Sequence, residues 1–527
     1  MTDDSRAIEV RSDVKGENAH LPSSGKTKVK VKTKINRATI LFSTVAVGSI
    51  FLLIYLIGTV DMYMAAGCAF SATLWLLWTS KRKIRRKELG RERGLAPILL
   101  VALAPLVGSL ILSSLGYMGP PAETLLRIIM TVGFSISIFV GTFPLPLAMM
   151  FKIQESRQQD GESYSYSYRP LVTILVPAYN EGEVISRTLE SLMNLKYENK
   201  EIIVIDDGST DLTSIIASWY KRLGVKVLRK PNGGKASALN YGLLFARGEI
   251  VITIDSDSMV EREAIDRIVR IMGDEKVAAV AGNIRVLNSK STITRIQELE
   301  YMMGINVVRR AFALYGSVMV VPGAFGAFRR NETIQAGGYD TDTLTEDFDL
   351  TIKLLKTGLQ VGSSSTGLGF TEVPSTWKVL YKQRLRWSTG TYQTIFKHRD
   401  AIWNRRYGLL HSLVFPMILL SLFNPITSFV ALGAGIYLAL TGGLLVFLKM
   451  ELLFLAVQVF VALVALSIDN EKYKLALYSP FFVVIYKQFL DYTTIVSAFR
   501  AIFGKSHHWH KIDRSGGMQT IKVYGKA

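Results

Sequence analysis

Hydrophobic and polar positions divide this 527-residue chain into three long blocks. Apolar stretches long enough to cross a bilayer dominate residues 38–152 and return after residue 407, and residues 153–376 between them are mixed in polarity. The first block predicts four transmembrane helices, over residues 38–60, 62–80, 95–115 and about 125–151. The last predicts about four more within residues 407–504, over 409–423, 427–447, 452–468 and about 475–490. Turns on the outer side are expected at Asn424–Pro425 and Asp469–Glu471.

The middle block alternates between short β-branched runs and helical patterns. Runs rich in Val and Ile predict strands over residues 171–177, 201–205, 225–228 and 249–254. The stretches between them, such as residues 235–247, predict helices. This alternation predicts an α/β domain with a doubly wound sheet, mixed but mainly parallel. The domain would be inserted between two groups of transmembrane α-helices.

Composition favours a membrane protein over a nucleic-acid-binding protein. The chain is 49% hydrophobic, yet Lys and Arg outnumber Asp and Glu by 62 to 43, a combination typical of spans with positive flanks. Basic residues cluster in the polar tail 1–37 and in the loop 81–94, which the positive-inside rule places in the cytoplasm. Residues 153–376 and the basic tail 505–527 are then expected in the cytoplasm too, and the protein in the cell membrane. With Cys68 as its one cysteine, the chain has no disulfide framework.

Acidic residues directly follow several predicted strands. Glu181 follows the first strand, Asp206 and Asp207 end the second, and Asp255 and Asp257 follow the fourth. Because the carboxyl ends of parallel strands lie along one crevice, we expect these acids to face a common ligand site. The oxygen-only Asp255-x-Asp257 pair suits a hard divalent ion that also binds a diphosphate. The alternative at each position is an ordinary turn, since Asp, Ser and Gly are common turn residues.

Two further stretches have both a functional and a structural interpretation. The run Gly323–Arg330 places a flexible backbone beside two arginines, which could contact a phosphate or a sugar. The alternative there is a loop with solvated arginines. A helix is expected to begin near Thr345, with Glu346 and Asp347 in its first turn. These acids either provide a carboxylate base at the rim of the crevice or cap the helix and favour its dipole.

Residues 377–406 mix aromatic and basic side chains around the motif Gln383-Arg-Leu-Arg386-Trp387. Such a mixture at helical spacing is typical of helices at a membrane interface. Nucleic-acid surfaces have a similar composition, but the flanking apolar spans argue against one here.

Together these motifs resemble those of the processive, membrane-embedded family 2 glycosyltransferases, which make hyaluronan, poly-N-acetylglucosamine, chitin and cellulose. The motifs appear in family order over about residues 170–390. They are Pro177-Ala-Tyr-Asn-Glu181, Asp206-Asp207-Gly208-Ser209, Gly234-Lys235-x-x-Ala238-Leu239-Asn240, Asp255-x-Asp257, Thr345-Glu346-Asp347 and Gln383-x-x-Arg386-Trp387. The stretch Thr371–Pro374 looks closer to hyaluronan and poly-N-acetylglucosamine synthases, whereas the number of spans looks closer to cellulose synthases. The resemblance therefore implies a GT-A-like fold and leaves the sugar open.

The resemblance implies a donor site for a UDP-sugar. Its expected residues are Glu181, Asp206, Asp207, Lys235, Asp255, Gln383 and Arg386. The acids after the first two strands would hold uracil and ribose, with Lys235 near the nucleotide, and Gln383 and Arg386 would contact the diphosphate. Asp257 would bind Mg²⁺ or Mn²⁺ with Asp255 beside it, and the ion would neutralise the leaving diphosphate as a Lewis acid.

The resemblance also implies an acceptor site. Asp347 would take the proton from the acceptor hydroxyl as it attacks the anomeric carbon. Glu346 would contact the acceptor, and Trp387 would stack against its sugar. One in-line displacement inverts the anomeric centre, so an α-linked donor would give a β linkage.

The expected function is therefore inverting transfer of a sugar from a UDP-sugar to a growing β-linked polysaccharide, which passes through the chain's own transmembrane helices. The expected partners are the UDP-sugar, the polysaccharide acceptor and the lipid bilayer, with no nucleic acid. The alternative is a non-processive enzyme that adds one sugar to a membrane lipid. A non-enzymatic transporter or scaffold is disfavoured, because the chain carries all the motif acids and Trp387.

Overall fold

A computed structural model describes residues 121–160 and 168–503, with scattered positions between 64 and 111. These residues all belong to one compact unit, Ile35–Ala527. Several expectations fall outside them: the tail 1–37, the helix 38–60, the loop 81–94 and the tail 505–527. The expected helices 62–80 and 95–115 are described only at isolated positions.

The strands described by the structure form one sheet, in the order β3-β2-β1-β4-β7-β6-β8-β5. Strands β3, β2, β1 and β4 are parallel neighbours, whereas β7 is antiparallel to both β4 and β6. The mixed α/β sheet expected from the sequence is thus present. Strand bounds are β1 Val172–Ala178, β2 Lys200–Asp206, β3 Val225–Arg229, β4 Ile250–Ile254, β5 Met259–Val260, β6 Val277–Val286, β7 Phe325–Arg329 and β8 Gln360–Thr371.

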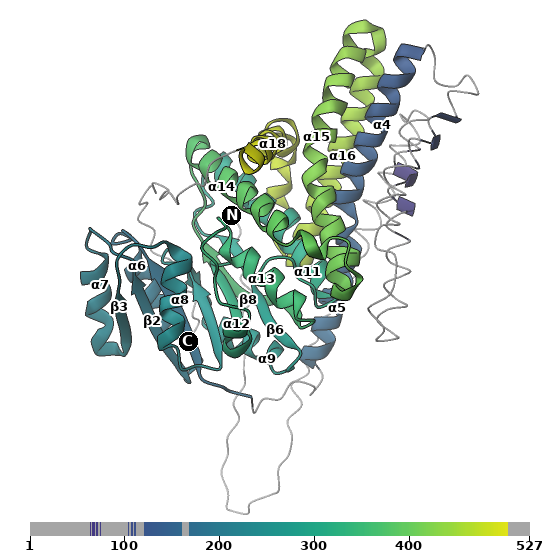
Figure 1. The fold of residues 1–527 in the computed structure, drawn as a ribbon. Helices are drawn as coiled ribbons and strands as arrows, with labels where there is room; N and C mark the ends of the chain where they lie inside the picture. Colours follow the sequence, from purple (N-terminus) through teal and green to yellow (C-terminus); the bar gives the residue numbers. More distant parts are fainter. Residues whose placement is uncertain are drawn as a thin grey trace, which may run out of the picture. The chain divides into compact units, whose positions relative to one another are not determined.

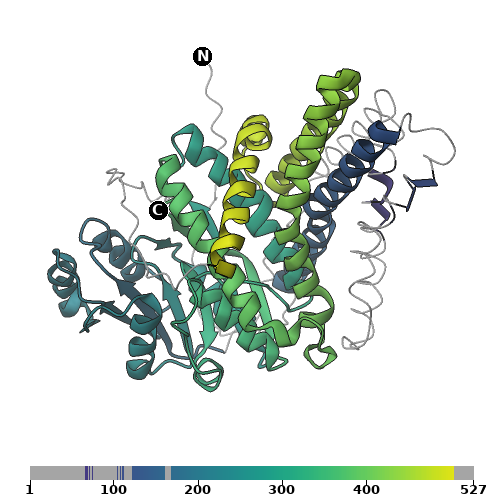
Figure 2. The same cartoon turned by 45° about the horizontal axis from the view of Figure 1, so that its top comes forward.

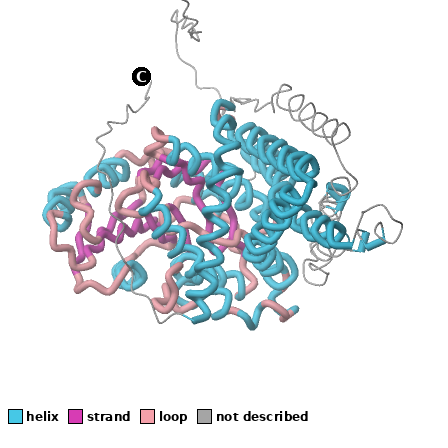
Figure 3. Tube along the Cα trace, turned by 90° about the horizontal axis from the view of Figure 1, so that it is seen from above, coloured by secondary structure: helices cyan, strands magenta, loops and turns pink. Residues whose placement is uncertain are grey.

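Helices cover both faces of the sheet (Figures 1 and 3). Leu175 of β1 points into a core shared with α8 and α13, whereas Ile174 and Val176 point into a second core shared with α6 and α9. Alternate residues of a strand face opposite sides, which is why a continuous apolar run suits a strand buried on both faces. The helices of this domain are α6 Ile185–Met193, α7 Thr213–Trp219, α8 Lys235–Phe245, α9 Ala264–Ile271, α10 Thr292–Glu300, α11 Val307–Ala313, α12 Arg330–Gln335 and α13 Glu346–Lys356.

Four long helices form what we call the apolar helix bundle: α4 Pro121–Thr142, α5 Pro144–Asp160, α15 Phe415–Leu438 and α16 Leu444–Asp469. Figure 1 shows α4, α15 and α16 side by side. Within the described residues, the segments Thr124–Ser156 and Leu410–Asp469 are long and apolar enough to cross a membrane. Their buried residues belong to the same core as α8, α11 and α13. The bundle and one face of the sheet are therefore packed together.

The turn expected at Asn424–Pro425 is wrong, because both residues lie inside α15. Asn424 accepts a hydrogen bond from Ser137 of α4, with 2.9 Å between Ser137 Oγ and Asn424 Oδ1. Proline inside an apolar helix is tolerated where neighbouring helices and side chains compensate for the lost backbone hydrogen bond. The chain turns instead at Gly442, whose φ of 108° is readily adopted only by glycine.

The expected outer position of Asp469–Glu471 is also wrong. Asp469 forms ion pairs with Arg310 of α11 and with Arg285 of β6, whose Nη2 lies 3.0 Å from Asp469 Oδ1. Glu471 Oε1 lies 2.9 Å from Arg285 Nη1. The turn after α16 thus lies against the α/β domain. The sequence predicted a polar turn, but it did not predict the ion pairs with Arg285 and Arg310.

The final segment does not form a second simple hairpin. It consists of η7 Tyr473–Tyr478, α17 Ser479–Phe481, η8 Phe482–Tyr486 and α18 Lys487–Phe503. Helix α18 packs against α14 (Trp377–Lys397), the helix that carries the Gln383–Trp387 motif, as Figure 2 shows in yellow and green. Short helices follow α14 at Arg399–Ala401 and Arg405–Tyr407.

Candidate active site

Asp206 lies at the end of β2, opposite Ala178 at the end of β1. It is completely buried, and its Oδ1 accepts a hydrogen bond of 2.9 Å from the N–H of Ser209. Its Oδ2 lies 3.4 Å from Arg229 Nε, an ion pair that lacks hydrogen-bond geometry. Asp206 therefore holds the loop that leaves β2 in place.

Asp207 fixes a second loop, Pro231–Gly234, through both of its carboxylate oxygens. Its Oδ1 lies 2.6 Å from Lys230 Nζ, and its Oδ2 accepts a hydrogen bond of 2.8 Å from the N–H of Gly234. The N–H of Gly233 also donates to this carboxylate, at 3.1 Å. Gly234 has a φ of 83°, which places its amide toward Asp207 at no steric cost. Lys235 follows directly as the first residue of α8, so this loop fixes the position of Lys235.

Glu181 belongs to the loop after β1 and is 8% exposed. Its N–H donates a hydrogen bond of 2.7 Å to Thr213 Oγ1, and its carbonyl accepts from Ile185 at the start of α6. The preceding Asn180, with φ 54°, donates through its N–H to Ser209 Oγ at 2.9 Å. The loops after β1 and β2, which carry Glu181, Asp206 and Asp207, are thus joined.

A second cluster is centred on Lys235, the first residue of α8. Its Nζ lies 2.6 Å from Asp255 Oδ1, just after β4, and 3.4 Å from Glu346 Oε1 at the start of α13. Burial disfavours the charged amine, but Asp255, Glu346 and Asp347 outweigh it and raise the pKa of Lys235. Lys235 is therefore a fixed cation between the Asp-x-Asp motif and the acids of α13.

Asp347 is oriented by backbone amides. Its Oδ2 accepts a hydrogen bond of 2.9 Å from the N–H of Gly323, and its Oδ1 accepts one of 2.8 Å from the N–H of Phe348. Burial raises the pKa of the neighbouring Glu346, while Lys235 and Arg386 of α14 act in the opposite direction. Lys235 and Arg386 are thus the cations that favour the charged form of Glu346.

The motif of α14 is organised by a residue that the sequence analysis did not single out, Arg384. It is 4% exposed, and its Nη2 lies 2.6 Å from Glu300 Oε2 and 3.4 Å from the hydroxyl of Tyr486. Its Nη1 donates a hydrogen bond of 3.0 Å to Gln383 Oε1, and its guanidinium lies 4.3 Å from the centre of the Trp387 ring. Arg384 occupies a position that the motif leaves unspecified, so the sequence did not indicate this role.

The sequence analysis also did not single out Asp349. This acid of α13 has a structural role, which was the alternative to a role in catalysis. It is completely buried, and its Oδ1 lies 2.9 Å from His398 Nε2 and 3.2 Å from Lys397 Nζ. Lys353 Nζ lies 3.7 Å from its Oδ2. By contrast, Thr345 makes no side-chain capping hydrogen bond to the helix. Asp349 thus ties the start of α13 to the end of α14.

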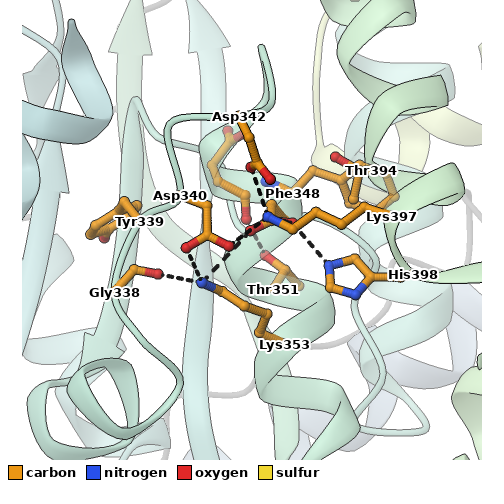
Figure 4. Close-up of polar contacts among 12 residues, drawn as sticks. Gly338, Tyr339, Asp340, Asp342, Phe348, Thr351, Lys353, Thr394, Lys397 and His398 are labelled. Carbon is orange, nitrogen blue, oxygen red and sulfur yellow. Dashed lines mark hydrogen bonds and ion pairs between the residues drawn. The ribbon is translucent and has the colours of Figure 1, made fainter. Parts of the chain in front are cut away.

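Figure 4 shows how the same lysines hold the loop before α13. Lys353 Nζ lies 2.9 Å from Asp340 Oδ1, and Lys397 Nζ lies 2.5 Å from Asp340 Oδ2 and 2.7 Å from Asp342 Oδ1. Burial works against the charged form of Asp340, but the two lysines lower its pKa to about 2. The loop that leads to Glu346 and Asp347 is therefore fixed at ordinary pH.

We expect Asp349→Asn to destabilise the protein by about 3 kcal/mol or more, because it leaves buried cations without their carboxylate. The thermal unfolding midpoint of the purified protein measures this. Asp342→Asn is the matched control: the Asp342 side chain is 63% exposed, so losing its pair with Lys397 should cost about 1 kcal/mol at most. Equal midpoints for the two variants would contradict the anchoring role of Asp349.

The interpretation of Arg329 as a phosphate or sugar contact is wrong. Arg329 pairs with Ile250 at the start of β4, the end of the strand remote from Asp255. Its Nε donates a hydrogen bond of 2.9 Å to the carbonyl of Val277, and its Nη1 lies 3.2 Å from Glu249 Oε1. The run Gly323–Arg330 is mostly the buried strand β7, and its first residue, Gly323, donates the hydrogen bond to Asp347.

The structure thus brings most of the expected site residues together. Glu181, Asp206 and Asp207 lie on two joined loops at the ends of β1 and β2. Lys235 contacts Asp255 and Glu346, and Asp347 and Arg386 act electrostatically on Glu346. Gln383 and Trp387 lie on α14 against Arg384.

The chemistry of Asp255 and Asp257 fits a hard divalent ion that takes further ligands from its substrate. Within the described residues, no group of three or more His, Cys, Asp or Glu side chains could hold a metal ion. Mg²⁺ is commonly bound by one or two carboxylates, waters and substrate phosphates, so a pair of aspartates suffices. Asp255 is paired with Lys235, and Asp257 Oδ1 accepts a hydrogen bond of 3.3 Å from Ser258 Oγ.

Comparisons with known proteins agree with this geometry. The family model "Glycosyl transferase family 2" matches residues 173–334. Poly-beta-1,6-N-acetyl-D-glucosamine synthases of Staphylococcus aureus (strain COL) and Staphylococcus epidermidis (strain ATCC 35984) are 34% and 32% identical to this chain over 251 and 269 residues. These matches cover 47% and 50% of this chain, and the chain spans 61% and 63% of the lengths of those relatives.

A solved structure supports the fold. A mannosyltransferase from Pyrobaculum calidifontis, in complex with GDP-Man and Mn²⁺, superposes with a TM-score of 0.51 and 23% identity. The match covers 70% of this chain and 99% of that one, which confirms a GT-A-like glycosyltransferase fold. The resemblance inferred from the motifs is likewise confirmed by the family match and the relatives. Residues 173–334 of this chain therefore match the glycosyl transferase family 2 model, and about half of the chain is similar to poly-beta-1,6-N-acetyl-D-glucosamine synthases.

Proposed function

We propose that this protein transfers a sugar from a UDP-sugar to the end of a growing β-linked polysaccharide, with inversion at the anomeric carbon. The observation that carries the proposal is the position of Asp347. Two backbone amides aim this carboxylate into a cluster with Lys235 and Asp255, at the carboxyl end of β4. A direct displacement requires a base close to the site that binds the donor diphosphate.

The donor would lie across the ends of β1, β2 and β4. Glu181, Asp206 and Asp207 shape the loops that would receive the uracil and ribose. Lys235 and Arg386, with Gln383, would contact the diphosphate, and their positive charge favours its departure. Asp257 would be the principal ligand of Mg²⁺ or Mn²⁺, with Asp255 beside it. When bound, the ion would supply Lewis-acid stabilisation of the departing UDP.

The reaction would be a single displacement. Asp347 would accept the proton of the acceptor hydroxyl as that oxygen forms its bond to the anomeric carbon. The bond from that carbon to the diphosphate oxygen breaks, and UDP leaves with the electron pair. The attacking oxygen approaches from the face opposite UDP, so an α-linked donor gives a β-linked product.

The acceptor would lie near α14 and the apolar helix bundle. One face of Trp387 is covered by Arg384, and the guanidinium also fixes Gln383. A sugar on the ring's other face would be held without a strict hydrogen-bond register, which suits a polymer that advances by one unit. The apolar length of Thr124–Ser156 and Leu410–Asp469 supports a multi-pass membrane protein. The basic tail 1–37 and the basic loop 81–94 favour a cytoplasmic α/β domain. The product would then cross through the chain's own helices.

N-acetylglucosamine is the sugar that the relatives favour, since the Staphylococcus proteins are poly-beta-1,6-N-acetyl-D-glucosamine synthases. The test is to incubate the purified full-length protein with labelled UDP-N-acetylglucosamine, UDP-glucose, UDP-glucuronate and GDP-mannose, and to size the products. We expect high polymer from UDP-N-acetylglucosamine. A single discrete glycolipid would favour the non-processive alternative, and no UDP release from any of the three UDP-sugars would refute the proposal.

A further inference from the structure

A glycine in the middle of α14, Gly390, lies against the loop that leads into α13. A Cβ atom added at Gly390 would lie 2.6 Å from Thr345 Cγ2, 2.7 Å from Thr345 Oγ1 and 3.0 Å from the carbonyl carbon of Leu344. Two of these atoms belong to a side chain, but the third belongs to the backbone and cannot rotate away. Glycine inside a helix costs about 1 kcal/mol relative to alanine. Here the missing side chain permits the close approach of helix and loop.

Side chains one turn further along α14 bind the same loop. Gln393 Oε1 accepts a hydrogen bond of 3.0 Å from the N–H of Leu344, and the hydroxyl oxygens of Thr394 and Thr345 lie 3.3 Å apart. Thr394 is completely buried, and Thr345 is 9% exposed. The loop is therefore held against α14 by close packing at Gly390 and by hydrogen bonds next to it.

The contact at Gly390 lies between the proposed base and the ligand-binding residues of α14. On the side of the loop, Asp347 follows Thr345 by two positions. On the side of the helix, Arg386 and Trp387 precede Gly390 by four and three positions, so they lie one turn away on the same face. The separation of helix and loop at this contact therefore sets how far the base lies from Arg386 and Trp387.

A second attachment of α13 to α14 lies further along the helix. Asp349 Oδ1 lies 3.2 Å from Lys397 Nζ, and Lys397 comes seven positions after Gly390, about 10 Å along the axis. That ion pair holds the two helices together. At Gly390, by contrast, the backbone of α14 itself meets the loop beside the base.

We propose that Gly390 is a positioning residue that holds Asp347 at its working distance from Arg386 and Trp387. The assignment rests on the proposed function, in which Asp347 is the base and α14 binds the diphosphate and the acceptor. Carbon atoms in contact normally lie about 3.5–4.0 Å apart, so a methyl group at this position would push helix and loop apart by about 0.5–1 Å. A misplacement of about 1 Å can cost on the order of 10²-fold in rate.

The test compares Gly390→Ala with wild type in the purified full-length protein, with UDP-N-acetylglucosamine as donor and a β-1,6-linked N-acetylglucosamine trisaccharide as acceptor. We expect kcat for transfer to fall roughly 10- to 100-fold. The affinity for UDP should change by no more than about threefold, because the loops after β1 and β2 take no part in this contact. Gly433→Ala is the matched control: Gly433 lies inside α15, a Cβ there would meet no described atom within 4 Å, and this variant should match wild type.

A second substitution tests whether crowding at this contact causes the loss. Thr345→Ala removes both side-chain atoms that lie closest to the added methyl group. Combined with Gly390→Ala, it should raise kcat about tenfold above that of Gly390→Ala alone. The carbonyl carbon of Leu344 remains in the way, so the double variant should stay below Thr345→Ala alone. Thermal unfolding midpoints are measured beside kcat, so that a loss of folded protein is not mistaken for a loss of rate.

Several results would overturn the assignment. An unchanged kcat in Gly390→Ala would do so, and a lower thermal unfolding midpoint beside it would make Gly390 a packing residue. No recovery in the double variant would mean that crowding at Thr345 is not the cause of the loss. If Gly390→Ala yields no folded protein, the double variant decides, and a kcat equal to that of Thr345→Ala would refute the assignment.

These outcomes are distinguishable from a failure of the proposed function. In each of them wild type still transfers sugar, so the proposed function stands. Wild-type protein that releases no UDP from any of the three UDP-sugars would instead refute the proposed function and the assignment of Gly390 with it.

Discussion

Replacing Asp347 by Asn should reduce sugar transfer by about 10²-fold or more and leave UDP binding nearly unchanged, because the variant removes only the proton acceptor. Asn has almost the same size, and its amide oxygen can keep the hydrogen bond from the N–H of Gly323 at the cost of the one from the N–H of Phe348. The site should therefore keep its shape. Transfer is measured as UDP release with saturating donor and acceptor, and binding by titration with UDP.

Glu346→Gln is the informative comparison for this variant. Glu346 Oε1 lies 3.4 Å from Lys235 Nζ, so the loss of its charge should weaken the position of that cation and affect donor binding as well. A variant of Asp347 that loses UDP binding and transfer to the same degree would mean that this residue supports the fold of the site. The assignment of the base would then be wrong.

Removal of divalent ions should abolish transfer, and addition of Mg²⁺ or Mn²⁺ should restore it. The physical reason is charge: the leaving diphosphate carries several negative charges, and the acids Asp255 and Asp257 lie where it would sit. Without a cation, acids and phosphates repel each other. The measurement is UDP release in chelator, followed by titration with each ion.

Asp257→Asn should behave like the chelated enzyme even when the ion is in excess. Ser258→Ala is a matched control, because Ser258 donates a hydrogen bond to Asp257 through its hydroxyl but cannot replace its charge. That variant should need more metal and still reach substantial activity. Full turnover by wild type in excess chelator would rule out the metal role.

Local sequence patterns predicted the α/β domain well for identifiable physical reasons. β1 and β4 are buried along their whole length, so their continuous β-branched runs left little choice other than a buried strand. Asp206 and Asp255 could be placed at one edge of the sheet because β1 lies between β2 and β4 and is parallel to both. The start of α13 at Glu346 followed from the leucines at helical spacing.

Contacts between distant segments could not be predicted in this way. Arg384 meets Glu300 and Tyr486, which are 84 and 102 positions away in the chain. Asp349 looks like its neighbour Asp347 in the sequence, yet it is the one that meets Lys397 and His398. The partners of an acid decide whether its role is catalytic or structural. These partners lie far away in the sequence, so no local pattern predicts them.

The ion pairs at the end of α16 decide whether the α/β portion can be produced on its own. Cutting the chain after residue 400 would remove Asp469 and Glu471, and would leave Arg285 and Arg310, 8% and 2% exposed, without their carboxylates. The same cut removes the apolar residues of α15 and α16 that share a core with α8, α11 and α13, and so exposes a large apolar surface. An excised fragment should therefore misfold or aggregate. The transferase portion is not a detachable module, and the helices that follow it act as part of its scaffold.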